Sequence, residues 1–304
     1  MRRFALATVA LTFVGVVVGA YVRLSDAGLG CPDWPLCYGR PVPDHGEDPR
    51  AWKEMGHRYL AGALGILIFV LLLVSLRTRQ SPRLAGAIAA LVVFQATLGK
   101  WTVTMLLKPA IVVAHLLGGM ALLALLVWFA LERMNHQESP ETRALRIPAL
   151  LALIAVGVQI LLGGWVSANY AALACPDLPL CLGQAVPPMD FGNAFHVLRE
   201  LGRTDSGDLL PQAALIAIHW SHRGFAMVVV AVVGWTVFAA RKAFSGLAIT
   251  IGLLLVLQFS LGVANVAFSL PLVLAAAHNA GAAALLASLV VLNFFAFRGL
   301  RPSG

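Results

Sequence analysis

The sequence predicts an all-α integral membrane protein whose eight transmembrane helices form two pseudo-symmetric four-helix bundles, related as a parallel internal repeat. Three observations support this fold class. Of 304 residues, 60% are hydrophobic and 12% are charged, whereas soluble globular domains have about 25% charged residues. Eight apolar windows are long enough to cross a bilayer. Motifs of the first half also recur, in the same order, in the second half.

Each apolar window contains about 20 residues, which is the length needed to cross a hydrocarbon core of about 30 Å. Backbone amides in lipid have no water to bond, so each window is expected to be helical, and nothing shows the alternation of a membrane barrel. Residues 1–24 have the basic start and apolar run of a secretory signal without a small-residue cleavage site, so we interpret them as an uncleaved span. The windows are residues 4–24, 57–76, 84–104, 109–131, 147–168, 212–240, 244–266 and 271–297.

The distribution of charge predicts the orientation of the chain. An even number of spans places both termini on one side, where the loops and termini carry a net charge of +9, against −1 on the other side. The positive-inside rule therefore predicts a multi-pass protein of the inner (cytoplasmic) membrane with cytoplasmic termini and with loops 25–53 and 169–211 outside. The formal charge of +8 then reflects topology and does not indicate a nucleic-acid partner.

The internal repeat divides the chain into two halves. We expect an N-terminal half at residues 1–135, a cytoplasmic linker at 136–146 and a C-terminal half at 147–304, with the halves related by an axis along the membrane normal. The repeated motifs are "CPDWPLC" (Cys31–Cys37) and "CPDLPLC" (Cys175–Cys181), "HR" at His57 and at His222, "QATLG" (Gln95–Gly99) and "QFSLG" (Gln258–Gly262), and finally His115 and His278.

The second half has a longer outer loop, because the offset between the halves grows by about 21 residues between the cysteines and the histidines. This loop contains "DFGNAFHVLREL", in which Phe191, Phe195, Leu198 and Leu201 share one helical face behind Asp190, a capping residue. The pattern predicts a short helix that lies in the outer interface.

Five of the eight histidines fall in or beside the spans: His57, His115, His219, His222 and His278. An ionisable residue within a span costs about 2.5–3.5 kcal/mol, so by default it faces a partner, a ligand or water. Asp48 and Pro49 read as an N-cap and first helical residue, which extends the second helix outward. His115 then lies about 9 Å below the start of its helix at Pro109, at a depth matching that of His57.

Two histidines on two helices of a bundle are a typical means of holding an iron porphyrin. We therefore predict that His57 with His115, and His222 with His278, coordinate haem iron near the outer leaflet. The glycines close to these positions leave room for a macrocycle, although small residues also serve ordinary helix packing; they are Gly62, Gly118, Gly119, Gly224 and Gly281. The alternatives are interfacial packing of single histidines and a zinc site, which lacks the expected carboxylates and thiols.

Arg58 and Arg223 each follow a predicted ligand directly. Haem propionates need cationic partners, and these arginines would supply them; the alternative is that the side chains snorkel to the interface. The cysteines predict disulfides Cys31–Cys37 and Cys175–Cys181 in an oxidising compartment. Each disulfide is either structural or active in redox exchange.

The halves differ three residues before the first histidine of each pair, where Glu54 occupies the position that His219 takes in the second half. A carboxylate beside a haem edge can relay protons or stabilise a developing cation, so the first half is interpreted as the reactive one. His219 would support the second site. In the alternative interpretation, Glu54 is an exposed helix carboxylate that pairs with Arg58.

These motifs resemble those of the haem A synthase family, whose E-x-x-H-R signature matches "EMGHR" (Glu54–Arg58). The resemblance covers essentially the whole chain. It implies oxidation of the C8 methyl group of haem O to a formyl group by successive hydroxylation and loss of water. It further implies Glu54 as the catalytic carboxylate, His57 and His115 around the substrate haem, and His222 and His278 on a haem b cofactor. Cys31–Cys37 would have a catalytic or haem-transfer role.

The same resemblance implies haem O synthase as donor of the substrate and the terminal oxidase assembly machinery as acceptor of the product. Membrane lipid, quinol and a second copy of the chain are further candidate partners. The competing function is a di-haem membrane cytochrome that carries electrons from quinol. A transporter is a third class, disfavoured because the spans offer few polar residues beyond Gln95, Gln159 and Gln258.

Overall fold

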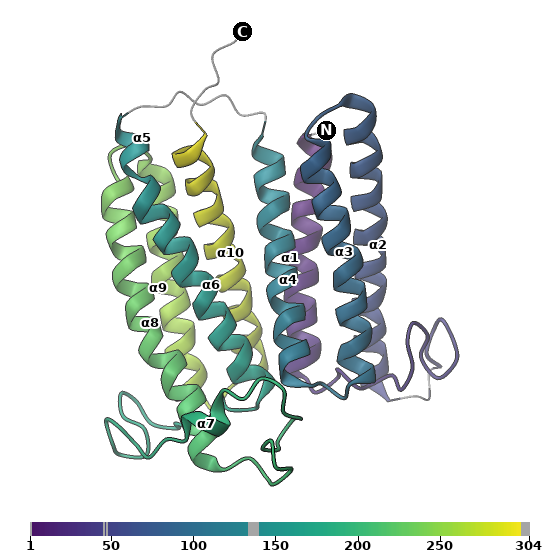
Figure 1. The fold of residues 1–304 in the computed structure, drawn as a ribbon, viewed down its shortest axis with the longest axis vertical. Coiled ribbons are helices and arrows are strands. Elements are labelled where there is room, and N and C mark those ends of the chain that lie inside the picture. The colour runs from purple at the N-terminus through teal and green to yellow at the C-terminus, as the bar shows by residue number, and fades with distance from the viewer. Residues whose placement is uncertain (1, 45, 47, 133–139, 299–304) are drawn as a thin grey trace.

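The computed structural model describes residues 2–44, 46, 48–132 and 140–298 (Figure 1). Within these ranges the chain is helical, with isolated β-bridges in its loops and no extended strand. The helices are α1 (Arg2–Leu24), α2 (Pro49–Thr78), α3 (Pro82–Thr104), α4 (Pro109–Leu131), α5 (Pro140–Ala144), α6 (Arg146–Ala168), α7 (Phe191–Ala194), α8 (Gln212–Ala240), α9 (Ser245–Ala267) and α10 (Leu272–Phe297).

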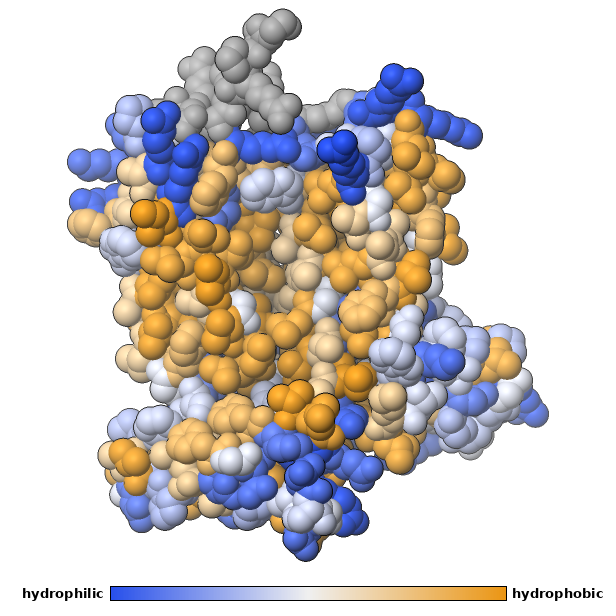
Figure 2. Space-filling model, viewed as in Figure 1, coloured by the Kyte–Doolittle hydropathy of each residue, from blue (hydrophilic) through white to orange (hydrophobic). Residues whose placement is uncertain are grey.

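The all-α membrane fold class is confirmed: of the helices in the described ranges, eight are long and apolar enough to cross a membrane. Figure 2 shows a hydrophobic band between two hydrophilic ends, as expected of a protein surrounded by lipid. The start of α2 is also as predicted, because the Asp48 side chain accepts a hydrogen bond from the backbone N–H of Arg50 and Pro49 occupies the first turn. Hydrogen bonds from the Arg50 side chain and backbone lower the pKa of Asp48.

Each half of the chain forms a ring of four long helices. In the first half α1 contacts α2, α2 contacts α3, α3 contacts α4 and α4 contacts α1; the second half repeats this order with α6, α8, α9 and α10. The halves meet where α4 and α10 contact each other, and where α10 contacts α1 and α4 contacts α6. That an axis along the membrane normal relates the halves, and that they divide at the predicted boundaries, stay predictions.

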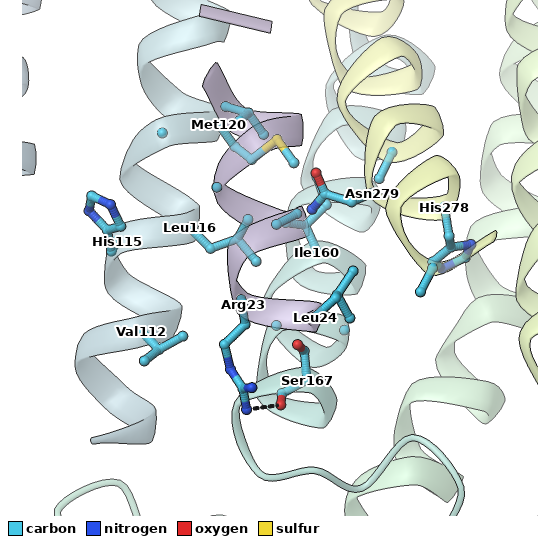
Figure 3. A pocket seen from close by; sticks show the side chains of 18 of the residues that line it. Arg23, Leu24, Val112, His115, Leu116, Met120, Ile160, Ser167, His278 and Asn279 are labelled. Carbon is cyan, nitrogen blue, oxygen red and sulfur yellow. Dashed lines mark hydrogen bonds between the residues drawn. The ribbon is translucent and has the colours of Figure 1, made fainter. Parts of the chain in front are cut away.

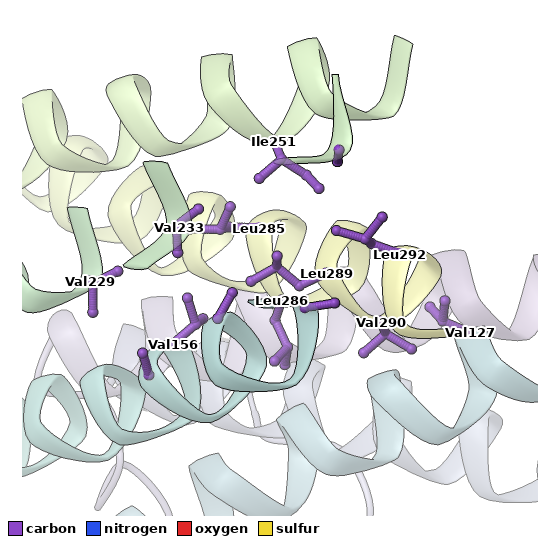
Figure 4. Close-up of a cluster of buried hydrophobic side chains, with 14 of the residues drawn as sticks. Val127, Val156, Val229, Val233, Ile251, Leu285, Leu286, Leu289, Val290 and Leu292 are labelled. Carbon is purple, nitrogen blue, oxygen red and sulfur yellow. The ribbon is translucent and has the colours of Figure 1, made fainter. Parts of the chain in front are cut away.

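The largest cluster of buried side chains belongs mainly to the second half (Figure 4). Leu289 of α10 lies at its centre among residues such as Val156 of α6, Val233 of α8 and Ile251 of α9. Val127 of α4 also belongs to this cluster, so a first-half helix contributes to the apolar packing of the second half. The two halves therefore share a core along α4.

The start of α1 and the end of α10 lie together at one end of the bundle, and the two long loops lie at the other, which we name the loop end (Figure 1). The loop end comprises the described parts of residues 25–48 and 169–211. Of the predicted linker 136–146, residues 136–139 lie outside the described ranges, and α5 forms most of the remainder.

The predicted interfacial helix in the second long loop is wrong in its length. Asp190 caps it, with its side chain accepting from the backbone N–H of Asn193, but helix α7 ends at Ala194. Leu198 and Leu201, predicted on the apolar face of this helix, lie beyond its end. Helix formation is weak because of Gly192 and Asn193, and Arg199 draws the chain inward, being only 2% exposed.

Candidate functional site

A cavity of about 1710 Å³ reaches through both halves and is lined by the four predicted ligands His57, His115, His222 and His278. Figure 3 shows His115 on α4 and His278 on α10 at opposite sides of this cavity, with the apolar side chains of Leu116 and Ile160 between them. His57 comes from α2 and His222 from α8. The structure therefore brings the four histidines to one cavity, and their division into two haem-binding pairs stays a prediction.

Each of these histidine rings packs against a glycine of a neighbouring helix, which keeps the ring beside the cavity. A Cβ atom added to Gly19 would lie 2.9 Å from Cε1 of His57, and one added to Gly163 would lie 3.0 Å from Cε1 of His222. A Cβ atom at Gly19 would force the ring of His57 to shift, and one at Gly163 would make an unusually tight contact with the ring of His222. The corresponding separations are 3.4 Å for Gly99 and His115, and 3.3 Å for Gly262 and His278.

Sequence reasoning missed these four glycines and named others. The signal was present, because Gly99 and Gly262 end the repeated Gln-x-x-Leu-Gly motif, and Gly19 and Gly163 are separated by the same 144 residues as the cysteine motifs. Two predicted glycines have a different use. A Cβ atom on Gly118 would clash with the side chain of Gln95, and one on Gly281 would clash with Gln258.

The residues of the cavity fit a haem. The Nδ1 atoms of His57, His115, His222 and His278 are buried and lack a hydrogen-bond partner in the described part of the chain. Buried polar atoms are normally paired, so each ring has a nitrogen whose hydrogen-bonding capacity is unused in the described chain. Neutral imidazoles against apolar surroundings are typical haem-iron ligands. Among the residues that the structure describes, no group of three or more His, Cys, Asp or Glu side chains could hold a metal ion.

Two glutamines contact the histidines of the second predicted pair. The side-chain amide of Gln159 donates to the backbone carbonyl of His222 at 3.1 Å, and Nε2 of Gln258 lies 3.4 Å from Nε2 of His278. Both glutamines line the cavity. They therefore lie beside the predicted haem b site, and neither was assigned to it from the sequence.

Arg58 and Arg223 act on the loops in the same way. Arg58 Nη1 donates to the backbone carbonyls of Asp33 and Leu36 at 2.9 and 2.7 Å. Arg223 donates to the backbone carbonyls of Asp177, Pro179 and Leu180, at 3.1, 2.8 and 3.1 Å. Both arginines thus hold the cysteine loops onto the helices, and their predicted role toward haem propionates stays a prediction.

The two predicted disulfides, Cys31–Cys37 and Cys175–Cys181, are present. Their cysteines are 0–2% exposed. In the first loop the Asp33 carboxylate accepts from the backbone N–H groups of Tyr38 and Gly39.

Asp177 repeats this arrangement in the second loop, where its carboxylate accepts from the backbone N–H groups of Leu182 and Gly183. The bond from Gly183 is the main reason why the pKa of Asp177 is lowered. The sequence repeat of the cysteine motifs is therefore also a repeat of local structure.

Glu54 and His219 hold equivalent positions against these loops. The Glu54 Oε2 atom accepts a hydrogen bond from the backbone N–H of Cys31 at 2.8 Å, and His219 Nδ1 accepts from that of Cys175 at 3.2 Å. Both side chains line the cavity and each residue is 4% exposed. The interpretation of Glu54 as an exposed carboxylate is therefore wrong, although its ion pair with Arg58 is present.

Comparisons with known proteins show the family of the chain. A model of the COX15-CtaA family, described as "Cytochrome oxidase assembly protein", matches residues 2–290. A protein of Shewanella oneidensis named "Heme A synthase" is 40% identical, over 95% of this chain and 94% of its own length. A protein of Caulobacter vibrioides with the same name is 31% identical, over 96% of this chain and 94% of its own. The alternative of a di-haem electron carrier gains no support, and the chain belongs to the haem A synthase family.

Proposed function

We propose that this chain oxidises the C8 methyl group of haem O to a formyl group, by successive hydroxylation and loss of water, and so produces haem A. The observation that carries the proposal is one cavity lined by four histidines, each with a buried nitrogen that has no partner in the described chain. Relatives of similar length are named "Heme A synthase". A methyl carbon is more reduced than a formyl carbon, so this conversion is an oxidation and the chain is proposed to be an oxidoreductase.

The second half is proposed to hold a resident haem b between His222 and His278. When bound, this group supplies one-electron transfer, which a side chain cannot supply. Gly163 and Gly262 leave space for the two rings, and Gln159 fixes the backbone at His222. His219 takes no part in coordination in this proposal, because its Nδ1 atom is used by the loop.

The first half is proposed to bind the substrate haem between His57 and His115. Glu54 lies one helical turn from His57 and lines the same cavity. Its carboxylate is held at both oxygens, by the Cys31 N–H and by Arg58. A fixed carboxylate can accept a proton or stabilise positive charge that develops at a substrate carbon, and His219 has no negative charge to offer in its place.

Several features of the chain would orient the substrate and exclude water from it. The small surfaces of Gly19 and Gly99 keep the histidine rings against their helices. The loop with Cys31 and Cys37 is pinned at the loop end by Glu54 and Arg58. A closed, low-dielectric site strengthens the electrostatic effect of Glu54.

The cellular setting is likewise part of the proposal. We place both termini in the cytoplasm, the loop end outside the inner membrane and the haem sites near the outer leaflet. Haem O synthase is the proposed donor, and the terminal oxidase assembly machinery is the acceptor. The burial of the cysteines favours structural disulfides over redox exchange with another protein.

The function is tested by expressing the full chain together with a source of haem O and extracting its haem. We expect the red-shifted pyridine haemochrome of haem A, and a strong loss of this signal when His57 is replaced by alanine. If haem O is recovered unchanged from protein whose two sites are filled, the chain is a carrier and the proposal is wrong.

A further inference from the structure

Arg23 is a third arginine that lines the cavity, beside Arg58 and Arg223. It lies in the last turn of α1, on the same helical face as Gly19, four residues earlier. Gly19 is the residue that packs against the ring of His57. Arg23 therefore lies one turn, about 6 Å, nearer the loop end than this contact.

The Arg23 side chain is 13% exposed and lines the cavity. Its Nη2 atom donates to the backbone carbonyl of Ser167 at 2.7 Å (Figure 3), and its guanidinium lies over the Tyr170 ring, 4.1 Å from the centroid. The nearest carboxylate belongs to Asp26, at 3.8 Å from Nη1, and that side chain is 66% exposed. The Nε atom is buried and finds no acceptor among the residues that the structure describes.

This environment differs from that of the other two arginines that line the cavity. Arg58 and Arg223 donate to several loop carbonyls each. Arg23 donates to one carbonyl, near the end of α6, and keeps a buried donor unsatisfied. An unsatisfied buried N–H is unfavourable unless a ligand completes it. Arg23 is thus the cavity arginine with capacity for an anion.

The cation is also specific to the first half. Gly19 and Gly163 are separated by 144 residues and have the same use, and the residue 144 positions after Arg23 is Ser167. The second half therefore presents a short neutral side chain where the first half presents a guanidinium. An anion-binding group at this position distinguishes the proposed substrate site from the proposed cofactor site.

We propose that Arg23 binds a propionate carboxylate of the porphyrin held in the first half. This inference rests on the proposed function, because it requires a porphyrin beside His57. Guanidinium groups bind carboxylates through paired, charge-assisted hydrogen bonds. The Nε atom of Arg23 is an unsatisfied donor that such a bond would use. Arg23 is a binding residue that sets the orientation of the ring, with its charged edge toward the loop end.

The test compares iron protoporphyrin IX with its dimethyl ester, in which the propionates have no charge. Detergent-solubilised full chain, produced without haem O, is titrated with each compound and followed at the Soret band. The variants are Arg23→Gln, Arg23→Lys and, as a control, Arg50→Gln, which removes a cation whose side chain is 55% exposed.

We expect the wild-type protein to bind the acid about tenfold more tightly than the ester, the factor typical of one charge-assisted hydrogen bond. Arg23→Gln should weaken binding of the acid about tenfold and leave the ester unchanged. Arg23→Lys should keep part of the preference, and Arg50→Gln all of it. Equal weakening of acid and ester in Arg23→Gln would show that Arg23 only ties α1 to α6, and unchanged binding of the acid would also overturn the inference.

Failure of the proposed function gives a different result. If the chain binds the acid through Arg23 but yields no haem A from haem O, the inference holds and the proposed reaction is wrong. If the wild-type protein binds neither compound, both are wrong.

Discussion

Glu54 and His219 occupy equivalent positions in the two halves and make the same contact with a loop, but they differ in charge. Each accepts the backbone N–H of the first cysteine in its loop, so the tether is common to both halves. Only Glu54 has a negative charge to place beside the cavity. The sequence predicted this difference in charge but not the tether, because a contact between a helix and a loop 23 residues away leaves no periodic pattern.

Two substitutions of Glu54 distinguish the effect of its negative charge from that of its hydrogen bond to Cys31. Glu54→Gln keeps an oxygen that can accept the Cys31 N–H, so we expect haem to be retained while formation of haem A falls about 100-fold or more, the usual effect of removing an acid–base group. Glu54→Ala should also leave the Cys31 N–H unpaired, a cost of about 1–3 kcal/mol, and so lower thermal stability. Normal haem A production by Glu54→Gln would show that the negative charge of Glu54 has no role in the reaction.

The glycines beside the histidines make a second prediction. In Gly163→Ala the new methyl group would lie 3.0 Å from Cε1 of His222, so the ring must move and haem content, measured as pyridine haemochrome per protein, should fall. Gly157→Ala is the matched control on the same helix, because its Cβ meets nothing within 4 Å. It should keep its haem and gain up to about 1 kcal/mol of helix stability. Equal haem content in both variants would contradict the role of Gly163.

Among the elements, the long helices follow from apolar length, with proline in the first turn of α2, α3 and α4 and a capping side chain at α2. These features are all local in sequence. The predicted windows agree with the helices to within a few residues, except that α2 begins eight residues before its apolar window, as its cap predicts. The length of α7 was overestimated, because the path of the chain after it depends on the contact of Arg199 with Asn169 at the end of α6. Burial lowers the pKa of Arg199, and no local sequence pattern predicts that this arginine is buried.

The loop of the second disulfide should lose structure in acid. The folded state holds the pKa of Asp177 below its ordinary value of 3.8, so this stabilisation is complete above the unfolded pKa and is lost as the pH falls through the folded pKa. Pepsin, which is active at low pH, should cut the loop faster at pH about 2 than at about 4.5. Asp177→Asn should be cut rapidly at both values, and Glu200→Gln should behave as wild type. A wild-type rate in Asp177→Asn would contradict this account.

Arg223 should protect the second disulfide. Cys175 and Cys181 are 0% and 2% exposed, and Arg223 fixes the intervening carbonyls. We expect Arg223→Gln to increase the rate at which a phosphine reductant and a maleimide label these cysteines. Arg203→Gln, a change in the same long loop, should leave the rate unchanged. Rapid labelling of the wild-type protein would instead favour a disulfide active in exchange.

At the scale of the whole molecule, the sequence predicted the repeat but not how its halves meet. Contacts between the halves use α1, α4, α6 and α10, and the lipid-facing and protein-facing sides of such helices are equally apolar, so composition does not distinguish them. The same limit applies to the cavity. The histidines were predictable as a set from their repeated spacing, whereas the glycines, Gln159 and Arg23 were recognised only when distant helices came together.

We propose that His57 with His115, and His222 with His278, each hold one haem. The most direct measurement is the haem content and low-temperature EPR spectrum of the purified wild-type protein and its four single histidine-to-alanine variants. We predict two haem signals, one lost or altered in both His57→Ala and His115→Ala, and the other in both His222→Ala and His278→Ala. If His57 and His222 variants affected the same haem, or if haem content were unchanged in all four, the account would be contradicted.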